Sequence, residues 1–326
     1  MRAVLPASTP PDPRPRLGEL PDPVPAPGEV LVAVRAAGLN RADLMQLRGQ
    51  YPPPPGESAV PGLELAGEVV AAEEGADGWE PGRRVMALVA GGGQGELAAV
   101  PAGQLMALPE GLSFVEGAAI SEAGLTAWTN LVVEGGLEAG ETVLISGANG
   151  GVGSFAVQLA AALGARVLAA GRDLARLEPL RALGAAGLLL LDDDLPARAR
   201  ELTGGRGADL ACDLVGGEHL PRLLAALAPR GRLILVGLTA GRTAELDLRQ
   251  ILSRRLRLVG STLRPRPRPE KAALVAAFAE FALPRLADGR LRPVIDWVFP
   301  FEEVAAAYAA LEAGEVVGKI VLDLGR

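Results

Sequence analysis

A glycine-rich run, GANGGVG, follows directly on the apolar stretch ETVLIS and opens a segment with helical spacing. A strand, a glycine turn and a helix N-terminus together place free backbone N–H groups against a pyrophosphate, as in dinucleotide-binding proteins. In the G-x-G-x-x-G register the first glycine is an alanine, so the motif by itself is weak. A tight turn without a ligand is the alternative, but such a turn would not need both Gly150 and Gly151. The predicted dinucleotide contacts are Ala148, Asn149, Gly150, Gly151, Val152 and Gly153.

The end of the next apolar strand bears on which dinucleotide is bound. NAD sites usually place an acidic residue about 20 residues beyond the glycines, on the ribose 2′-hydroxyl. Here Gly171 stands at that position and Arg172 and Asp173 follow it. Glycine leaves room for a 2′-phosphate, Arg172 can pair with that group bidentately, and Arg176 lies one helical turn further on. The pattern favours NADPH, with two alternatives open: the arginines are only solvated, or Asp173 caps a helix or binds a hydroxyl.

Composition narrows the class of protein. The 326 residues are 49% hydrophobic and 22% charged, which predicts a folded protein of about two domains. A net charge of −7 argues against a nucleic-acid surface, and no apolar run reaches the ~18 residues of a membrane span. One cysteine excludes internal disulfides and favours the cytoplasm. Only two of the 32 basic residues are lysines, so any single arginine is weak evidence by itself.

Nucleophiles and metal ligands are scarce. The chain has one histidine, His219, and one cysteine, Cys212, whereas catalytic zinc needs about three protein ligands. No Ser-His-Asp or Cys-His set can be assembled, so we predict no metal site. Hydride transfer to a quinone or an activated alkene needs neither a metal nor a nucleophile, only hydrogen-bond donors for the oxyanion and a proton from water.

The elements that must position these residues change in character twice along the chain. Residues 1–120 read as short strands bounded by Gly and Pro, with an extended edge segment at 10–27. In residues 121–262 short apolar strands alternate with amphipathic helices, including one over 173–184, which predicts a parallel sheet covered on both faces. Residues 263–326 return to mixed character. We therefore expect a dinucleotide domain (121–262) inserted into a substrate domain made of 1–120 and the return segment 263–326.

Three segments carry a resemblance to a known family: 36–70, 117–131 together with 146–165, and 293–324. In family order they resemble the zinc-free quinone oxidoreductase (zeta-crystallin-like) branch of the medium-chain dehydrogenase/reductase superfamily. The stretch GLNRADLMQLRGQYPPPPG looks most like its stress-inducible quinone reductases. The resemblance implies an α/β fold: a Rossmann doubly wound parallel sheet inserted into a GroES-like, mainly β substrate domain. Zinc-dependent relatives carry Cys at the position of Asn40 and His at that of Leu63.

The resemblance also implies site residues. Asn40 and Tyr51 would line the catalytic pocket, where the amide and the hydroxyl can donate hydrogen bonds to a carbonyl oxygen. An Asx turn at Asn40 and packing of Tyr51 on the following prolines are the alternatives. Thr126 resembles a threonine that contacts the nicotinamide amide, and Lys319 matches a position near the cofactor; a helix-bonded hydroxyl and a solvated lysine remain open. Asp43 and Glu64 would support the cleft.

Two departures from the family pattern limit which of the family's site contacts can be expected in this chain. Leu190 stands where several members have a tyrosine near the 2′-phosphate, and the carboxylates Asp192 to Asp194 follow closely. Both would make the NADPH preference modest. Met45 replaces a pocket tyrosine and makes the pocket softer and less polar.

These observations lead to one expectation with named alternatives. We expect an NADPH-dependent, metal-independent reductase that passes hydride to a quinone in a cleft between its domains. An alkenal or enone reductase and a nucleotide-binding protein with little turnover are the alternatives; the ligand count makes a zinc alcohol dehydrogenase improbable. We also expect a cytoplasmic homodimer, partly from the apolar strand 232–237 near a sheet edge, with a small-molecule partner and neither nucleic acid nor membrane.

Overall fold

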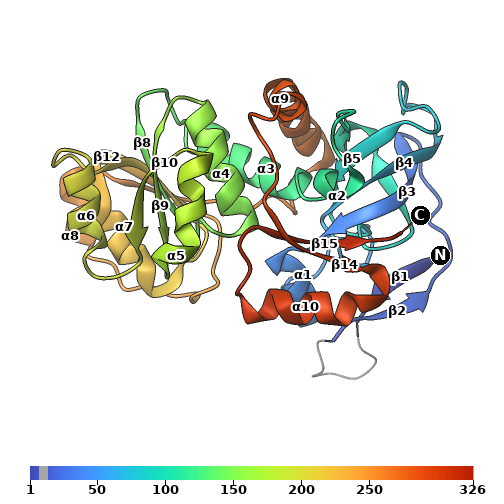
Figure 1. The fold of residues 1–326 in the computed structure, drawn as a ribbon, viewed down its shortest axis with the longest axis horizontal. Helices are drawn as coiled ribbons and strands as arrows, with labels where there is room; N and C mark the ends of the chain where they lie inside the picture. The colour runs from blue at the N-terminus through green and yellow to red at the C-terminus, as the bar shows by residue number, and fades with distance from the viewer. Residues whose placement is uncertain (7–13, 326) are drawn as a thin grey trace. The chain divides into compact units, whose positions relative to one another are not determined.

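A computed structural model describes residues 1–6 and 14–325 (Figure 1). Its contacts divide the chain into two compact units. Unit 1 combines Met1–Leu125 with Leu263–Arg326, and unit 2 is Thr126–Thr262.

Unit 2 is built on a six-stranded parallel sheet in the order β10-β9-β8-β11-β12-β13. The strands are β8 (Thr142–Ser146), β9 (Arg166–Gly171), β10 (Ala185–Leu190), β11 (Ala208–Asp213), β12 (Leu227–Leu235) and β13 (Arg257–Gly260). Renumbered within the unit this order is 3-2-1-4-5-6, the doubly wound Rossmann arrangement. The predicted fold of this part of the chain is confirmed.

Helices cover both faces of this sheet (Figure 1). They are α4 (Gly151–Ala162), α5 (Leu174–Leu177), α6 (Leu195–Leu202), α7 (Leu220–Ala226) and α8 (Leu248–Arg254). The central strands are rich in apolar residues because both of their faces are buried, as in β9, where every residue after Arg166 is buried.

Unit 1 is mainly β. Its seven-stranded sheet runs β14-β15-β3-β4-β5-β7, with β6 paired to β3, and a separate two-stranded sheet joins β1 and β2. The strands are β1 (Arg2–Leu5), β2 (Arg16–Glu19), β3 (Glu29–Gly38), β4 (Glu64–Ala72), β5 (Arg84–Leu88), β6 (Leu97–Pro101), β7 (Leu105–Ala107), β14 (Ile295–Pro300) and β15 (Lys319–Asp323). The helices are α1 (Arg41–Leu47), α2 (Phe114–Gly117), α9 (Arg268–Ala287) and α10 (Val304–Ala313). Strand β15 pairs antiparallel with β3, so the two ends of the chain share one sheet.

Some elements differ from the sequence-based expectation. The single helix predicted over 173–184 is a short α5 followed by a 3-10 turn (Glu178–Leu183), because Pro179 cannot donate the helical hydrogen bond. Of the apolar strand expected near a sheet edge at 232–237, residues 232–235 belong to β12, which pairs with β11 and with the edge strand β13 and so lies next to the edge. Of the predicted edge segment 10–27, residues 10–13 lie outside the described residues; β2 within it is a strand.

Candidate active site

The glycine run of unit 2 connects β8 to α4 as predicted. Gly147 has a positive φ of 62°, a conformation that glycine adopts without strain. Just before it, the Ser146 hydroxyl donates to Asp213 Oδ1 at 2.6 Å and accepts from the backbone N–H of Leu214 at 3.0 Å. These bonds join the C-terminal ends of β8 and β11. The first amides of α4 have no carbonyl one turn earlier in the helix, so they are free to donate to an anion.

Two glycines of this run serve different purposes. A Cβ on Gly153 would lie 2.4 Å from the carbonyl oxygen of Gly147 and 2.6 Å from Ala148 Cα, so the close approach of helix and turn requires glycine there. Gly150 has an ordinary φ of −77°, and the nearest neighbour of a Cβ there would be 3.5 Å away. Nothing within the described protein therefore demands glycine at 150. Gly150 is therefore a candidate for contact with a ligand lying against the half-exposed backbone.

The candidate 2′-phosphate contacts lie at the end of β9. A Cβ on Gly171 would lie 3.1 Å from Leu177 Cδ2 and 3.4 Å from Asn149 Oδ1, so a larger residue would crowd the glycine run. Arg172 is exposed. Asp173 caps α5 by accepting from the backbone N–H of Ala175 at 2.9 Å, which realises the capping alternative for this carboxylate.

The remaining charges nearby are partly compensated. Arg176 is half-buried and lies 3.7 Å from Asp173, a loose ion pair. In the acidic run after β10, Asp193 pairs with Arg222 at 2.8 Å and Asp192 accepts from the backbone N–H of Asp194. The negative charge of that run is thus less than its sequence suggests.

Thr126 is buried in α3 (Ser121–Trp128). Its carbonyl oxygen accepts from Asn130 Nδ2 at 2.7 Å, one turn further along, where the helix widens into a π-helical turn (Thr129–Val133). Such turns are frequent at functional sites.

In unit 1 the structure brings together Asn40 and Lys319, which are 279 residues apart. The Lys319 ammonium donates to Leu39 O and Asn40 Oδ1, both at 2.7 Å, and lies 2.5 Å from Glu64 Oε1. Asn40 Nδ2 donates to the same Glu64 oxygen at 3.0 Å. The other oxygen of Glu64 accepts from the backbone N–H of Glu122 at 2.8 Å. Asn40 is also the N-cap residue of α1 and forms a capping box with Asp43, so its local role as a cap coexists with these longer-range bonds.

A second buried carboxylate holds the loop before α1. Asp43 accepts from the backbone N–H of Asn40 at 2.8 Å, from that of Gly62 at 3.2 Å and from Gln94 Nε2 at 3.3 Å. Tyr308 in turn donates its hydroxyl to Gln94 Oε1 at 2.7 Å. Burial raises the pKa of Asp43 to about 6, although the backbone hydrogen bonds from Asn40 and Gly62 and the positive charges of Lys319 and Arg264 oppose the shift. Asp43 therefore fixes the backbone from which the Asn40 side chain projects.

Tyr51 is half-buried beneath an arginine. The Arg264 guanidinium lies 5.1 Å from the ring centroid and donates to Tyr51 O at 3.0 Å, to Ala90 O at 2.7 Å and to Gln46 Oε1 at 2.6 Å. Burial raises the pKa of Tyr51, with Glu122 adding to the shift and Arg264 opposing it. The hydroxyl therefore keeps its proton at neutral pH and can donate it.

Sequence reasoning missed Arg264 and Lys271. Lys271 is buried and donates to the carbonyl oxygen of Arg264 at 3.3 Å. A signal for Lys271 was available, because it is one of only two lysines in the chain. Arg264 gave none, since arginine is so common here that its position alone did not stand out.

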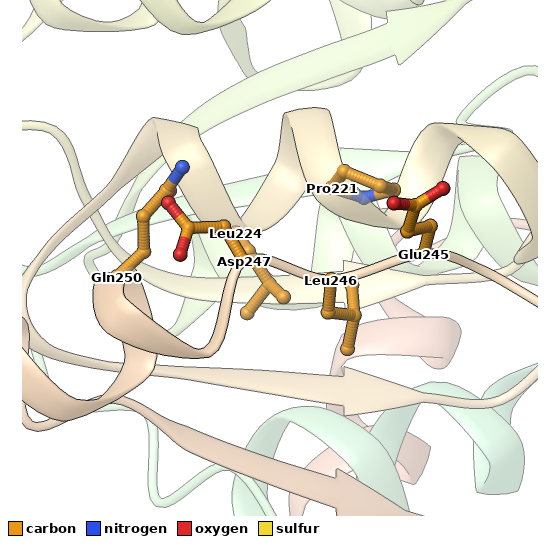
Figure 2. A pocket seen from close by; sticks show the side chains of 6 residues that line it. All are labelled: Pro221, Leu224, Glu245, Leu246, Asp247 and Gln250. Carbon is orange, nitrogen blue, oxygen red and sulfur yellow. The ribbon is translucent and has the colours of Figure 1, made fainter.

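Other features carry less chemistry. A pocket of about 400 Å³ in unit 2 contains none of the predicted residues (Figure 2). Its lining comes from α7, α8 and the segment between β12 and α8: Pro221, Leu224, Glu245, Leu246, Asp247 and Gln250. Burial raises the pKa of Cys212 to about 12, so its thiol is not a nucleophile.

The described residues offer neither a metal cluster nor a membrane helix. Among residues 1–6 and 14–325, no three His, Cys, Asp or Glu side chains are grouped so that they could hold a metal ion. In the same part of the chain, every helix is too short or too polar to cross a membrane.

Comparison with known proteins agrees with this architecture. The alcohol dehydrogenase GroES-like domain matches residues 26–110, which confirms the predicted character of unit 1, and the zinc-binding dehydrogenase family matches residues 151–280. Human quinone oxidoreductase is 30% identical over 305 residues, covering 93% of this chain and 91% of that protein. A quinone oxidoreductase-like protein 2 homolog of Nematostella vectensis is 29% identical over 299 residues, covering 90% and 81%.

A solved structure shows the same fold over the full length. The quinone oxidoreductase from Thermus thermophilus, solved also in its complex with NADPH, is 37% identical and superposes with a TM-score of 0.83 over 99% of this chain and 100% of that one. The chain therefore belongs to the quinone oxidoreductase branch of the medium-chain dehydrogenase/reductase superfamily and is an oxidoreductase of that family.

Proposed function

We propose that the protein is an NADPH-dependent, metal-independent reductase that transfers hydride to a quinone. The observation that carries the cofactor proposal is Gly150, which stands where the protein itself has room for a side chain. The Thermus relative, solved with NADPH, supports the same interpretation. When bound, the nicotinamide supplies the hydride.

In this proposal the glycine run from Ala148 to Gly153 holds the pyrophosphate, and Thr126 contacts the nicotinamide amide. Arg172 and Arg176 hold the 2′-phosphate. Support for NADPH over NADH comes from Gly171, which puts no carboxylate at this point, and from Asp173, whose carboxylate is engaged in capping α5.

Asn40 and Tyr51 are the proposed catalytic residues. Asn40 Nδ2 has one hydrogen on Glu64 and a second hydrogen left to donate, and the Tyr51 hydroxyl keeps its proton. Both can stabilise the oxygen on which negative charge develops as the acceptor is reduced. A quinone or a conjugated enone presents such an oxygen.

The metal-independent part of the proposal rests on ligand chemistry. The zinc-binding positions of dehydrogenase relatives are occupied here by Asn40 and Leu63, and the one cysteine is a buried thiol in unit 2. Elemental analysis of active protein, with turnover measured before and after a chelator, checks this. Stoichiometric zinc, or activity lost to the chelator and restored by zinc, would contradict it.

The deciding experiment is NADPH oxidation followed by absorbance with a panel of quinones, enones and alkenals, and the reverse reaction with alcohols and NADP. We expect quinone-dependent oxidation. Preference for enones would identify an enone reductase, and NADPH binding without turnover a nucleotide-binding protein.

The role of Asn40 is tested by Asn40→Ala. Removing an oxyanion donor should lower kcat by on the order of 10². The affinity for NADPH should stay near the wild-type value, because Asn40 is proposed to contact the acceptor alone. Unchanged turnover would remove Asn40 from the site.

We also propose a homodimer, with a second copy meeting the edge strand β13. That strand is unpaired on its outer side in the described sheet, and Leu258 on it and Leu252 on α8 are 42% and 80% exposed. Large exposed apolar side chains beside an open sheet edge are typical of a contact surface.

A cytoplasmic location is proposed from cysteine usage. The only cysteine, Cys212, is buried and unpaired, as suits a reducing compartment. Cell fractionation with an antibody to the protein checks this.

A further inference from the structure

Both lysines of this chain are buried. Lys271 is 2% and Lys319 4% exposed, whereas the other basic residues of the 32 are all arginines. A lysine among so many arginines marks a place where a compact ammonium fits and a planar guanidinium does not. Lys319 meets that description, because its ammonium donates to Leu39 O and Asn40 Oδ1 and is paired with Glu64 Oε1.

These partners determine how the Asn40 amide is turned. An ammonium can only donate and a carboxylate can only accept. Lys319 therefore holds the amide oxygen and Glu64 holds the amide nitrogen. The reversed amide would set N–H against the ammonium and oxygen against the carboxylate.

Glu64 is itself fixed. It is 0% exposed, and its second oxygen accepts from the backbone N–H of Glu122. The opposite charges of Lys319 and Glu64 are paired, so this pair has no net charge. Together they orient the uncharged amide of Asn40, which is half-buried. One N–H of Asn40 Nδ2 is then left to donate.

We propose that Lys319 and Glu64 are positioning residues that hold the Asn40 amide with its N–H as the group offered to substrate, and so select acceptors that present an sp² oxygen. This inference rests on the proposed function, in which Asn40 contacts the acceptor. It gives Lys319 a role different from the cofactor contact that the family resemblance implies, since its ammonium is buried and its partners Leu39, Asn40 and Glu64 all lie within unit 1.

The test is a double-mutant cycle between Lys319 and Asn40. Lys319→Met should lower kcat about tenfold in the wild-type background, with little change in KM for NADPH, and should have no further effect in the Asn40→Ala background. Lys319→Arg should not rescue, because the guanidinium cannot meet the three acceptors together. Equal losses of kcat in both backgrounds, or full activity of Lys319→Arg, would overturn the proposal.

A control separates positioning from general stability. Arg35 on β3 pairs with Glu68 on β4, and these two strands belong to the same sheet as Glu64 and Lys319, so Arg35→Met removes an ion pair from that sheet. It should lower Tm without changing kcat. If Lys319→Met does not fold because it leaves Glu64 unpaired, the cycle is run with Lys319→Met/Glu64→Gln, which removes both charges.

A second measurement does not depend on turnover. The side-chain ¹⁵NH₂ signals of Asn40, assigned by their loss in Asn40→Ala, should be sharp in the wild type and broadened or doubled in Lys319→Met, as the amide becomes free to turn. Unchanged signals would overturn the inference even in an active enzyme. If the signals change as expected but the protein reduces no acceptor, the proposed function is refuted. The orientation of the Asn40 amide by Lys319 and Glu64 would still be supported.

Discussion

The residues proposed to bind substrate and cofactor differ greatly in how many hydrogen bonds fix their side chains. Asn40 is bonded through its backbone N–H, its amide oxygen and its amide nitrogen, while Arg172 is exposed to solvent. A preorganised donor stabilises developing charge without reorganising. An exposed arginine, in contrast, can contribute only when a phosphate arrives to pair with it.

Arg172→Ala should therefore weaken NADPH binding by roughly 10 to 100-fold, the loss of one charge-assisted contact. NADH, which lacks the 2′-phosphate, should bind as before. Calorimetric titration with both cofactors measures the difference. Arg181→Ala, which removes an exposed arginine that pairs with Glu178, is the control and should change neither affinity. Equal weakening of both cofactors by Arg172→Ala would refute the 2′-phosphate role.

Asp43 makes the stability of the protein depend on pH. Burial raises its pKa to about 6, above the value of an unfolded aspartate, so the folded chain holds a proton that the unfolded chain releases. The stability that this proton brings is complete below about pH 4 and is lost as the pH rises through about 6. Between about pH 4 and pH 6 the free energy of unfolding of the wild type should therefore fall by on the order of 3 kcal/mol relative to that of Asp43→Asn.

Urea unfolding from pH 4 to pH 7 measures this difference in the free energy of unfolding. The exposed Asp77→Asn is the matched control and should follow wild type throughout. Parallel stability curves for wild type and Asp43→Asn would show that the carboxyl is not shifted.

At the scale of elements, the turn between β8 and α4 separates a packing requirement from the binding requirement that we propose. Gly153 is needed because backbone atoms of the turn lie within 3 Å of where a Cβ would be. Gly150 is under no such restriction. The two glycines should therefore respond differently to the same added methyl group.

Gly153→Ala should cost about 1–3 kcal/mol of stability, the usual cost of overpacking. Gly150→Ala should keep the wild-type Tm and yet bind NADPH at least about tenfold more weakly, because its methyl group would occupy the space proposed for the pyrophosphate. Thermal unfolding and cofactor titration of the two variants decide this. Full NADPH affinity in Gly150→Ala would leave that glycine unexplained and weaken the cofactor proposal.

At the scale of the whole molecule, the open edge of the unit 2 sheet predicts association. Light scattering should give twice the 33.5 kDa of one chain. Leu252→Lys/Leu258→Lys should shift the mass to that of a monomer, since charges on an edge oppose pairing. Leu174→Lys, at an exposed leucine on α5, should stay dimeric. A wild-type monomer would refute the dimer.

Much of the fold could be predicted because its signals are local. Apolar strands alternating with helices predicted the parallel sheet, and the glycine run predicted the turn before α4. Local signals failed where a proline shortened α5 and where the edge strand β13, with three of its four residues exposed, offered no apolar run to notice.

Residue types and their order along the chain were sufficient for the family, the two kinds of fold and the candidate cofactor turn, since each depends on neighbours in sequence. The contacts of Asn40 with Glu64 and Lys319 were decided only by tertiary structure. The pairing of β15 with β3 brings a lysine near the C-terminus to an asparagine near the N-terminus, and no local pattern encodes a contact over 279 residues. Which way the amide faces follows from those charges, and so could be known only once they were placed.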